Sequence, residues 1–211
     1  MIKRSFINLF AIPMAILATM LTGCASTELA PLPLKLPSLA PPTTAIAMQR
    51  VQPQPARMMV VDQRPQHHAL RLHHGANPAQ FATLQEPIAT IVRQQLAPYF
   101  SYRGDHPLLL QVTIEQALCV ANESFSSHNM NCTVVVQANA SVPASSWSKS
   151  FTTTRSREGK FKLKNDYIQI DIAAVLNGAL SELINDAEFY TWLNTYVPNA
   201  AHVIEETTDA F

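Results

Sequence analysis

Proline content divides this chain more sharply than any other feature of its sequence. Seven of its 15 prolines fall within residues 25–56, and that stretch contains no glycine. Because proline fixes φ and lacks a backbone N–H, such a segment cannot build a regular helix or a central strand. We therefore expect an extended, semi-rigid tether over residues 24–56. A second arrangement stays open, in which part of the tether packs on the folded domain as an arm through its leucines, Leu32, Leu34, Leu36 and Leu39.

The N-terminus has the layout of a secretory signal peptide. Lys3 and Arg4 precede an uncharged, mostly apolar stretch over residues 5–22. The region closes with a sequence that resembles a bacterial lipobox, Leu21-Thr22-Gly23-Cys24. That resemblance implies cleavage before Cys24, attachment of diacylglycerol to its sulfur, and acylation of the new N-terminus with fatty acids such as palmitate. We predict a signal peptide at residues 1–23 and lipidation at Cys24.

Acylation of Cys24 predicts a firm membrane anchor. Each buried CH₂ contributes ~0.8 kcal/mol and one chain anchors only marginally, so several chains hold a protein far more firmly. Residue 25 is Ala rather than the Asp that favours inner-membrane retention, which resembles the pattern sorted to the outer membrane. We expect a lipid-anchored protein of the outer membrane that faces the periplasm.

The folded domain is expected over residues 57–197, followed by a loose tail at 198–211. A short apolar run at residues 58–61 predicts a first strand. Thr83 with Glu86 three residues later has the form of a capping box. The apolar spacing that follows predicts a first helix.

Alternation of period two then predicts three strands, at residues 108–115, 132–142 and 147–157. The clearest element is a long second helix that starts at Asn165 or Asp166. Its apolar residues recur on one stripe, Ile168, Ile172, Val175, Leu176, Ala179 and Leu183. The order β-α-β-β-β-α predicts an α+β fold, in which an antiparallel four-stranded sheet carries two helices on one face.

The lipobox, the proline-rich tether and this order of elements resemble the YajG-like lipoproteins. A basic, Ser/Thr-rich strand that runs into a polar turn and a long helix, residues 153–183, adds to the resemblance. It covers residues 57–190 in outline. It implies an uncharacterised lipoprotein of the Gram-negative envelope, and therefore a location and a fold but no activity. The most specific match is short and ends the first strand: Val60, Val61, Asp62 and Arg64.

Four of the seven histidines fall within eight residues, as two adjacent pairs. Neutral imidazole is a good ligand for zinc, copper or nickel, so the candidate metal ligands are His67, His68, His73 and His74. Adjacent side chains of a strand point in opposite directions, so only one histidine of each pair could face a common ion. Gly75 and Pro78 indicate a loop here, although residues 69–72 fit a short strand. We expect a solvated His-rich loop without a tight metal site, and no cofactor.

Cys119 and Cys132 flank a polar loop between two predicted strands. Because paired thiols oxidise in the periplasm, we predict a disulfide between them. Alternation along the strands places Cys119 outward and Cys132 inward, so the bond requires a bulge or a register shift. The alternative is two free, buried thiols.

Six positive charges lie within 16 residues of the fourth predicted strand and the turn after it. They form a possible partner surface for phosphate, lipid head groups or an acidic protein, and they are Lys149, Arg155, Arg157, Lys160, Lys162 and Lys164. The simpler interpretation is an edge strand kept soluble by its charge.

Charge and motifs argue against several classes of function. Lys+Arg and Asp+Glu are both 15, so the formal net charge is zero and no nucleic-acid partner is indicated. The chain contains no nucleophile-elbow, zinc-protease or phosphate-loop motif, so we expect no enzymatic activity. The sequence favours a non-catalytic envelope accessory that binds membrane lipid through Cys24 and another envelope protein through its sheet. The alternative is a periplasmic module that binds a metal or small ligand through the His-rich segment.

Overall fold

The computed structural model describes residues 32–37, 39 and 53–197. The predicted signal peptide, the lipidation site Cys24 and the tail at 198–211 lie outside these residues. The described part of the chain forms eight strands and three helices. In order, they are β1 (Leu32–Leu34), β2 (Gln54–Asp62), β3 (His68–His74), β4 (Gln80–Leu84), α1 (Ile88–Leu96), β5 (Phe100–Tyr102), β6 (Leu109–Glu123), β7 (Ser127–Val142), β8 (Ser145–Lys160), α2 (Asn165–Ile184) and α3 (Ala187–Tyr196).

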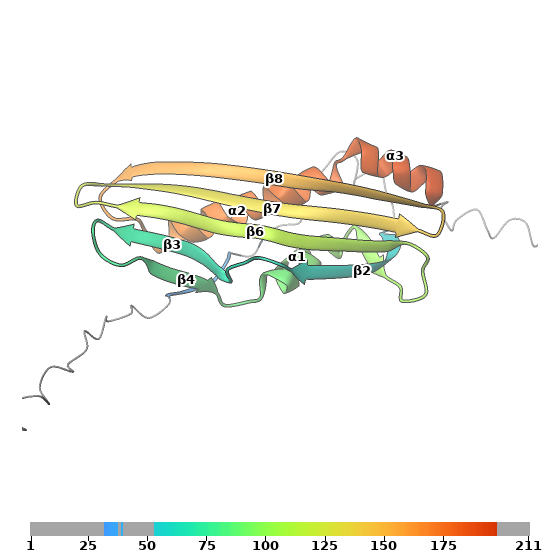
Figure 1. The fold of residues 1–211 in the computed structure, drawn as a ribbon, viewed down its shortest axis with the longest axis horizontal. Coiled ribbons are helices and arrows are strands. Elements are labelled where there is room, and N and C mark those ends of the chain that lie inside the picture. Colours follow the sequence, from blue (N-terminus) through green and yellow to red (C-terminus); the bar gives the residue numbers. More distant parts are fainter. Residues whose placement is uncertain (1–31, 38, 40–52, 198–211) are drawn as a thin grey trace, which may run out of the picture.

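The predicted antiparallel sheet of four strands with two helices is wrong. Within the described ranges the strands form one eight-stranded sheet that mixes parallel and antiparallel pairs, and it carries three helices. The antiparallel part is the meander β6–β7–β8, in strands of 15, 16 and 16 residues. Figure 1 shows these three strands side by side along the length of the molecule, with the helices behind them.

The parallel part forms because β2 and β3 pair in tandem with the same edge of β6. β2 covers the first half of that edge, from Arg57 opposite Leu109 to Asp62 opposite Ile114. β3 covers the second half, with Leu70 opposite Cys119. The sheet continues from β3 through β4 to β1, and from β2 to β5. The strand predicted at residues 58–61 is part of β2, and the short strand allowed at 69–72 is part of β3; together β2 and β3 match the length of β6.

A bulge in β6 decides which side chains enter the core. Ile114 pairs with Val136 and Gln116 with Val135, so Glu115 has no partner in β7. Ile114 and the alternate residues before it are buried, whereas after the bulge the buried positions become Ala117, Cys119 and Ala121. An extra residue shifts the alternation of a strand by one, which turns the opposite set of side chains inward.

The core lies between the sheet and the helices. α2 packs on β7 and β8, and its predicted apolar stripe is confirmed, because all six residues from Ile168 to Leu183 in that stripe are buried. By length and composition α2 could also cross a membrane, but here its apolar face is covered by the sheet. α2 ends at Ile184. Asp186 Oδ1 then accepts a hydrogen bond of 2.8 Å from the Phe189 N–H and caps the start of α3.

The N-terminal segment behaves partly as an arm. β1 pairs in parallel with β4, Leu34 is buried, and Gln95 Nε2 donates to the Leu39 carbonyl at 3.1 Å. Proline is tolerated in such an edge strand.

The predicted capping box is wrong: Thr83 lies in β4, and α1 begins only after Pro87.

Candidate functional site

The paired histidines lie on or beside strand β3, so the predicted His-rich loop is wrong. His67 remains 79% exposed, with Nδ1 3.6 Å from Asp62 Oδ2. The His68 ring packs on Phe81 with 4.7 Å between centroids. Burial lowers the pKa of His68, and the positive charges of nearby arginines add to this effect. Both effects favour the neutral form of this half-buried ring.

The remaining two histidines point to different surroundings. His74 Nδ1 lies 2.7 Å from Glu123 Oε2, and the other carboxylate oxygen accepts a 2.8 Å hydrogen bond from the Leu163 N–H. His73 instead lines an open depression. The four histidines therefore diverge, and within the described ranges no three His, Cys, Asp or Glu side chains are placed to hold a metal ion.

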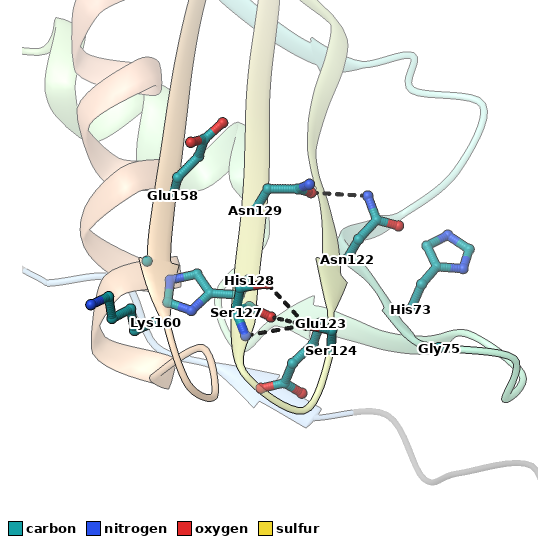
Figure 2. Close-up of a pocket in the computed structure, with 11 residues that line it drawn as sticks. His73, Gly75, Asn122, Glu123, Ser124, Ser127, His128, Asn129, Glu158 and Lys160 are labelled. Carbon is teal, nitrogen blue, oxygen red and sulfur yellow. Dashed lines mark hydrogen bonds between the residues drawn. The ribbon is translucent and has the colours of Figure 1, made fainter.

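That depression, of about 630 Å³, lies where β3, β6, β7 and β8 end together (Figure 2). Inside it His128 is buried and its Nδ1 lies 2.8 Å from the Phe161 carbonyl oxygen. Asn122 Nδ2 donates to Asn129 Oδ1 at 3.1 Å. Small-molecule sites are mostly apolar and enclose their ligand, whereas this depression is open and polar. Its lining includes His73, Glu123, His128, Glu158 and Lys160.

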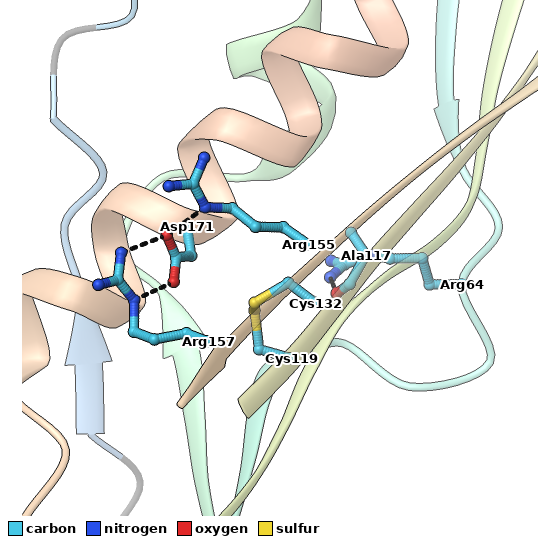
Figure 3. Close-up of a disulfide and its surroundings, with 7 residues drawn as sticks. All are labelled: Arg64, Ala117, Cys119, Cys132, Arg155, Arg157 and Asp171. Atoms are coloured by element: carbon cyan, nitrogen blue, oxygen red, sulfur yellow. Dashed lines mark hydrogen bonds and ion pairs between the residues drawn. A yellow bond between two sulfur atoms is a disulfide. The ribbon is translucent and has the colours of Figure 1, made fainter. Parts of the chain in front are cut away.

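Three of the six basic residues of the predicted partner surface form ion pairs within the protein. Asp171 of α2 is fully buried, and Arg157 grips it with Nε at 2.5 Å and Nη2 at 2.8 Å (Figure 3). Arg155 Nε lies 2.7 Å from the same carboxylate. The bidentate bond raises the pKa of Arg157 above its ordinary value. Two arginines of the predicted surface therefore fasten α2 to β8.

Lys149 is engaged in the same way at the other end of β8. Its Nζ donates to Asp186 at 2.7 Å and to Glu188 at 2.9 Å, and these bonds raise the pKa of Lys149. Lys160, Lys162 and Lys164 are exposed. The available basic surface is thus confined to the last three lysines, at one end of the sheet.

The Asp62 and Arg64 of the first-strand motif fill the gap between β2 and β3. Arg64 binds the Asp62 carboxylate with Nε and Nη2, both at 2.8 Å. Its Nη1 donates at 3.4 Å to the carbonyl of Ala117, a residue of the β6 edge that neither strand reaches. The hydrogen bonds from Arg64 lower the pKa of Asp62, against the opposing effect of burial. The motif therefore closes the sheet where its backbone ladder is interrupted.

The predicted disulfide is present. Cys119 and Cys132 face each other in the β6–β7 ladder, are both buried, and are bonded (Figure 3). The bulge at Glu115 supplies the shift that the bond requires, because it turns Cys119 to the inner face. The disulfide fastens the two central strands of the meander.

The outer face of the meander was not singled out from the sequence. On β7 and β8 it carries hydroxyl and amide side chains in register, such as Asn131 opposite Ser156 and Gln137 opposite Ser150. Ser148 Oγ donates to Asn139 Oδ1 at 2.6 Å. The outward residues of β8 are exposed and uncharged over most of its length: Ser146, Ser148, Ser150, Thr152, Thr154 and Ser156. The three helices lie on the opposite face (Figure 1), so none of them covers this surface.

Comparison with known proteins shows likeness at two levels. The model of a family described as uncharacterised lipoproteins matches residues 41–194. Among solved structures, a Xanthomonas campestris protein of the DUF330 family is similar at 10% identity and a TM-score of 0.49, over 77% of this chain and 98% of that one. A second uncharacterised protein is similar at 12% identity and a TM-score of 0.34, over 63% and 99%.

No curated protein matches the chain. Both TM-scores lie below 0.5, so the structural likenesses carry no argument about function. The family match is different, because it spans most of the chain and includes β2 through most of α3. This chain belongs to the family of uncharacterised lipoproteins.

Proposed function

We propose that this chain is a YajG-like lipoprotein, anchored in the outer membrane and facing the periplasm, that binds another envelope protein without catalysing a reaction. Membership of a lipoprotein family supports the anchor. The lipobox makes Cys24 the residue that carries the acyl chains, and Ala25 matches the sorting pattern of the outer membrane. Acylation at one N-terminal residue leaves the whole folded domain in the periplasm.

The observation that carries the binding role is the long, uncovered meander. β8 pairs only with β7 among the described residues, so the other edge of a 16-residue strand is open to a partner strand. Added strands gain affinity from main-chain hydrogen bonds and specificity from alternate side chains. The outer face beside that edge is uncharged, and charged residues are depleted at the centre of protein interfaces.

One further feature bears on the role. The depression beside His73 is open and polar, and does not enclose a substrate. A metal or small-ligand module ranks second, because only His73 of the predicted set of four lines that depression.

Site-specific photocrosslinking tests the binding role. A benzoylphenylalanine is placed at Ser150 or Thr152, both on the outer face of β8, in the full-length lipoprotein, and membranes are irradiated. The matched control places it at Gln94, an exposed residue of α1. We expect one discrete crosslinked band from both β8 positions and none from the control. The same bands from all three positions, or none from β8, would contradict the proposal.

A further inference from the structure

Two turns at one end of the sheet expose phenylalanine side chains to solvent. Phe125 lies in the β6–β7 turn and is 100% exposed, and Phe161 lies in the β8–α2 turn and is 71% exposed. The Phe161 N–H donates to the Ser126 carbonyl at 2.9 Å, which holds the two turns side by side. Figure 1 shows both turns at the same end of the long strands. Large apolar side chains exposed on neighbouring turns can mark a contact site for a protein or a membrane.

Local structure gives no reason for an aromatic residue at position 161. Its φ is 64°, in the left-handed region that glycine adopts freely and a bulky side chain adopts only at a cost. Neither phenylalanine joins the core. A strained, exposed phenylalanine on one turn and a fully exposed one on the neighbouring turn indicate that these side chains contact something other than this chain.

Three lysines flank Phe161 in the sequence. Lys160, Lys162 and Lys164 are exposed, and none of them forms an ion pair with a described residue. The nearest carboxylates in the sequence are Glu158 and Asp166, and Glu123 also lies at this end, where its Oε1 accepts a hydrogen bond from the Leu163 N–H. Aromatic residues with flanking lysines favour the interface of a membrane, where rings sit among the head groups and lysines reach the phosphates.

The position of the N-terminal arm relates this end to the lipid anchor. Leu32 of β1 pairs with Ala82 of β4, and β4 follows the β3–β4 turn, whose Gly75 N–H donates to the carbonyl of Glu123 at the end of β6. Cys24 precedes Leu32 by eight residues, which span at most about 29 Å. The long strands extend over about 50 Å. The anchor therefore reaches the end that carries the phenylalanines far more easily than the opposite end.

We propose that this end, defined by Phe125, Phe161, Lys160, Lys162 and Lys164, is a membrane-contact surface. It rests on the same bilayer leaflet that holds the acylated Cys24, an inference that depends on the lipid anchor of the proposed function. The phenylalanines enter the interfacial layer, and the lysines meet the phosphates of anionic lipids. The contact orients the long sheet away from the membrane and presents the outer face of β7 and β8 to the periplasm.

Spin labels on the full-length acylated lipoprotein test this surface. The protein is reconstituted into vesicles of phosphatidylethanolamine and phosphatidylglycerol, and flotation measures anchoring separately. A nitroxide at Ser126→Cys reports on the turn beside Phe125, and one at Ala144→Cys, in the β7–β8 turn, is the matched control at the opposite end. The native thiols do not react, because Cys119 and Cys132 are bonded and Cys24 is acylated. The measured quantity is the ratio of oxygen to nickel-complex accessibility.

We expect the protein to float, and the ratio at position 126 to exceed that at position 144. The ratio should fall to the control value when Phe125 and Phe161 are both changed to Ser. Equal ratios at the two positions in floating protein would overturn the contact surface and leave the anchor intact. Loss of access to both reagents at position 126 would indicate a protein occupant, and would also overturn it. Protein that does not float would overturn the anchor and this inference together.

Discussion

The buried carboxylate of Asp171 offers the sharpest test of how the long helix is held to the sheet. Asp171→Asn keeps the shape of the side chain but removes its charge. The two guanidinium groups around it, at 2.5–2.8 Å, then lose their counter-ion, and one amide N–H₂ group faces an arginine donor. Removal of one partner from a buried ion pair leaves an uncompensated charge, which costs about 3–5 kcal/mol of stability.

Partial exposure of the arginines reduces that cost. Their side chains keep 48% (Arg155) and 25% (Arg157) exposure, so water solvates part of each charge when the carboxylate is gone. We therefore expect Asp171→Asn to lower the free energy of unfolding by about 2–3 kcal/mol, below the fully buried case. In urea this loss moves the unfolding midpoint by about 1 M.

The assay is urea unfolding of the oxidised protein, followed by far-UV circular dichroism at pH 7. Arg155→Gln is the matched control, because that side chain makes one contact with Asp171 and is half exposed. Its expected loss is below about 1 kcal/mol. A change of less than about 0.5 kcal/mol for Asp171→Asn, as for an ordinary surface substitution, would refute the reasoning.

Three further predictions follow from single contacts. Gly178→Ala puts a Cβ 2.8 Å from Thr153 Cγ2, so we expect thermal unfolding to show a net loss of stability of about 1 kcal/mol. Adding Thr153→Ala should restore that stability, and a double variant without recovery would contradict the clash. The pKa of Asp62 is lowered in the fold, so its ion pair stabilises the protein fully above the ordinary pKa of 3.8. The difference in unfolding free energy between the native protein and Asp62→Asn should therefore fade as the pH falls through the lower folded pKa. A difference that does not change with pH would argue against this ion pair. Zinc titration of the mature protein should show weak binding without fixed stoichiometry, whereas a one-to-one complex abolished by changing His68 and His73 together would establish a site.

Local patterns in the sequence indicate the long strands and the long helix, because those patterns are repeated over many residues. The alternation that predicts strands at 132–142 and 147–157 continues in β7 and β8 to the ends of their ladders. The apolar stripe of α2 is likewise buried as its spacing predicts. Only the ends are misjudged, since polar residues near the turns, such as Ser127 and Lys160, still pair.

The parallel pairing of β2 and of β3 with β6 could not be predicted, because it depends on contacts between residues far apart in the chain. β3 combines polar outward residues with a short buried set, so its sequence indicates a loop as readily as a strand. Pro87 gave a usable signal at the capping box, since the residue before a proline favours extended backbone. That preference agrees with the strand β4 and a helix beginning at Ile88.

The ion pairs of Arg155 and Arg157 with Asp171 could not be predicted for the same reason, because they join residues of two different elements. A run of basic residues on a strand looks like a free surface until the helix that crosses it is placed. Asp171 gave a signal, because it lies beside Ile172 of the apolar stripe and a buried carboxylate requires a partner. Cys119 shows the opposite case: the demand for a bond with Cys132 predicted a bulge, which lies at Glu115.

Mass spectrometry of the N-terminal peptide from membrane-extracted protein tests the lipid anchor most directly. The chain belongs to a lipoprotein family, and its only lipobox cysteine is Cys24. We predict a mature protein that begins at Cys24 and carries three acyl chains, and a Cys24→Ser variant that is neither acylated nor cleaved by the lipoprotein signal peptidase. An unmodified peptide that begins at Met1, or normal maturation of the Cys24→Ser variant, would contradict the account.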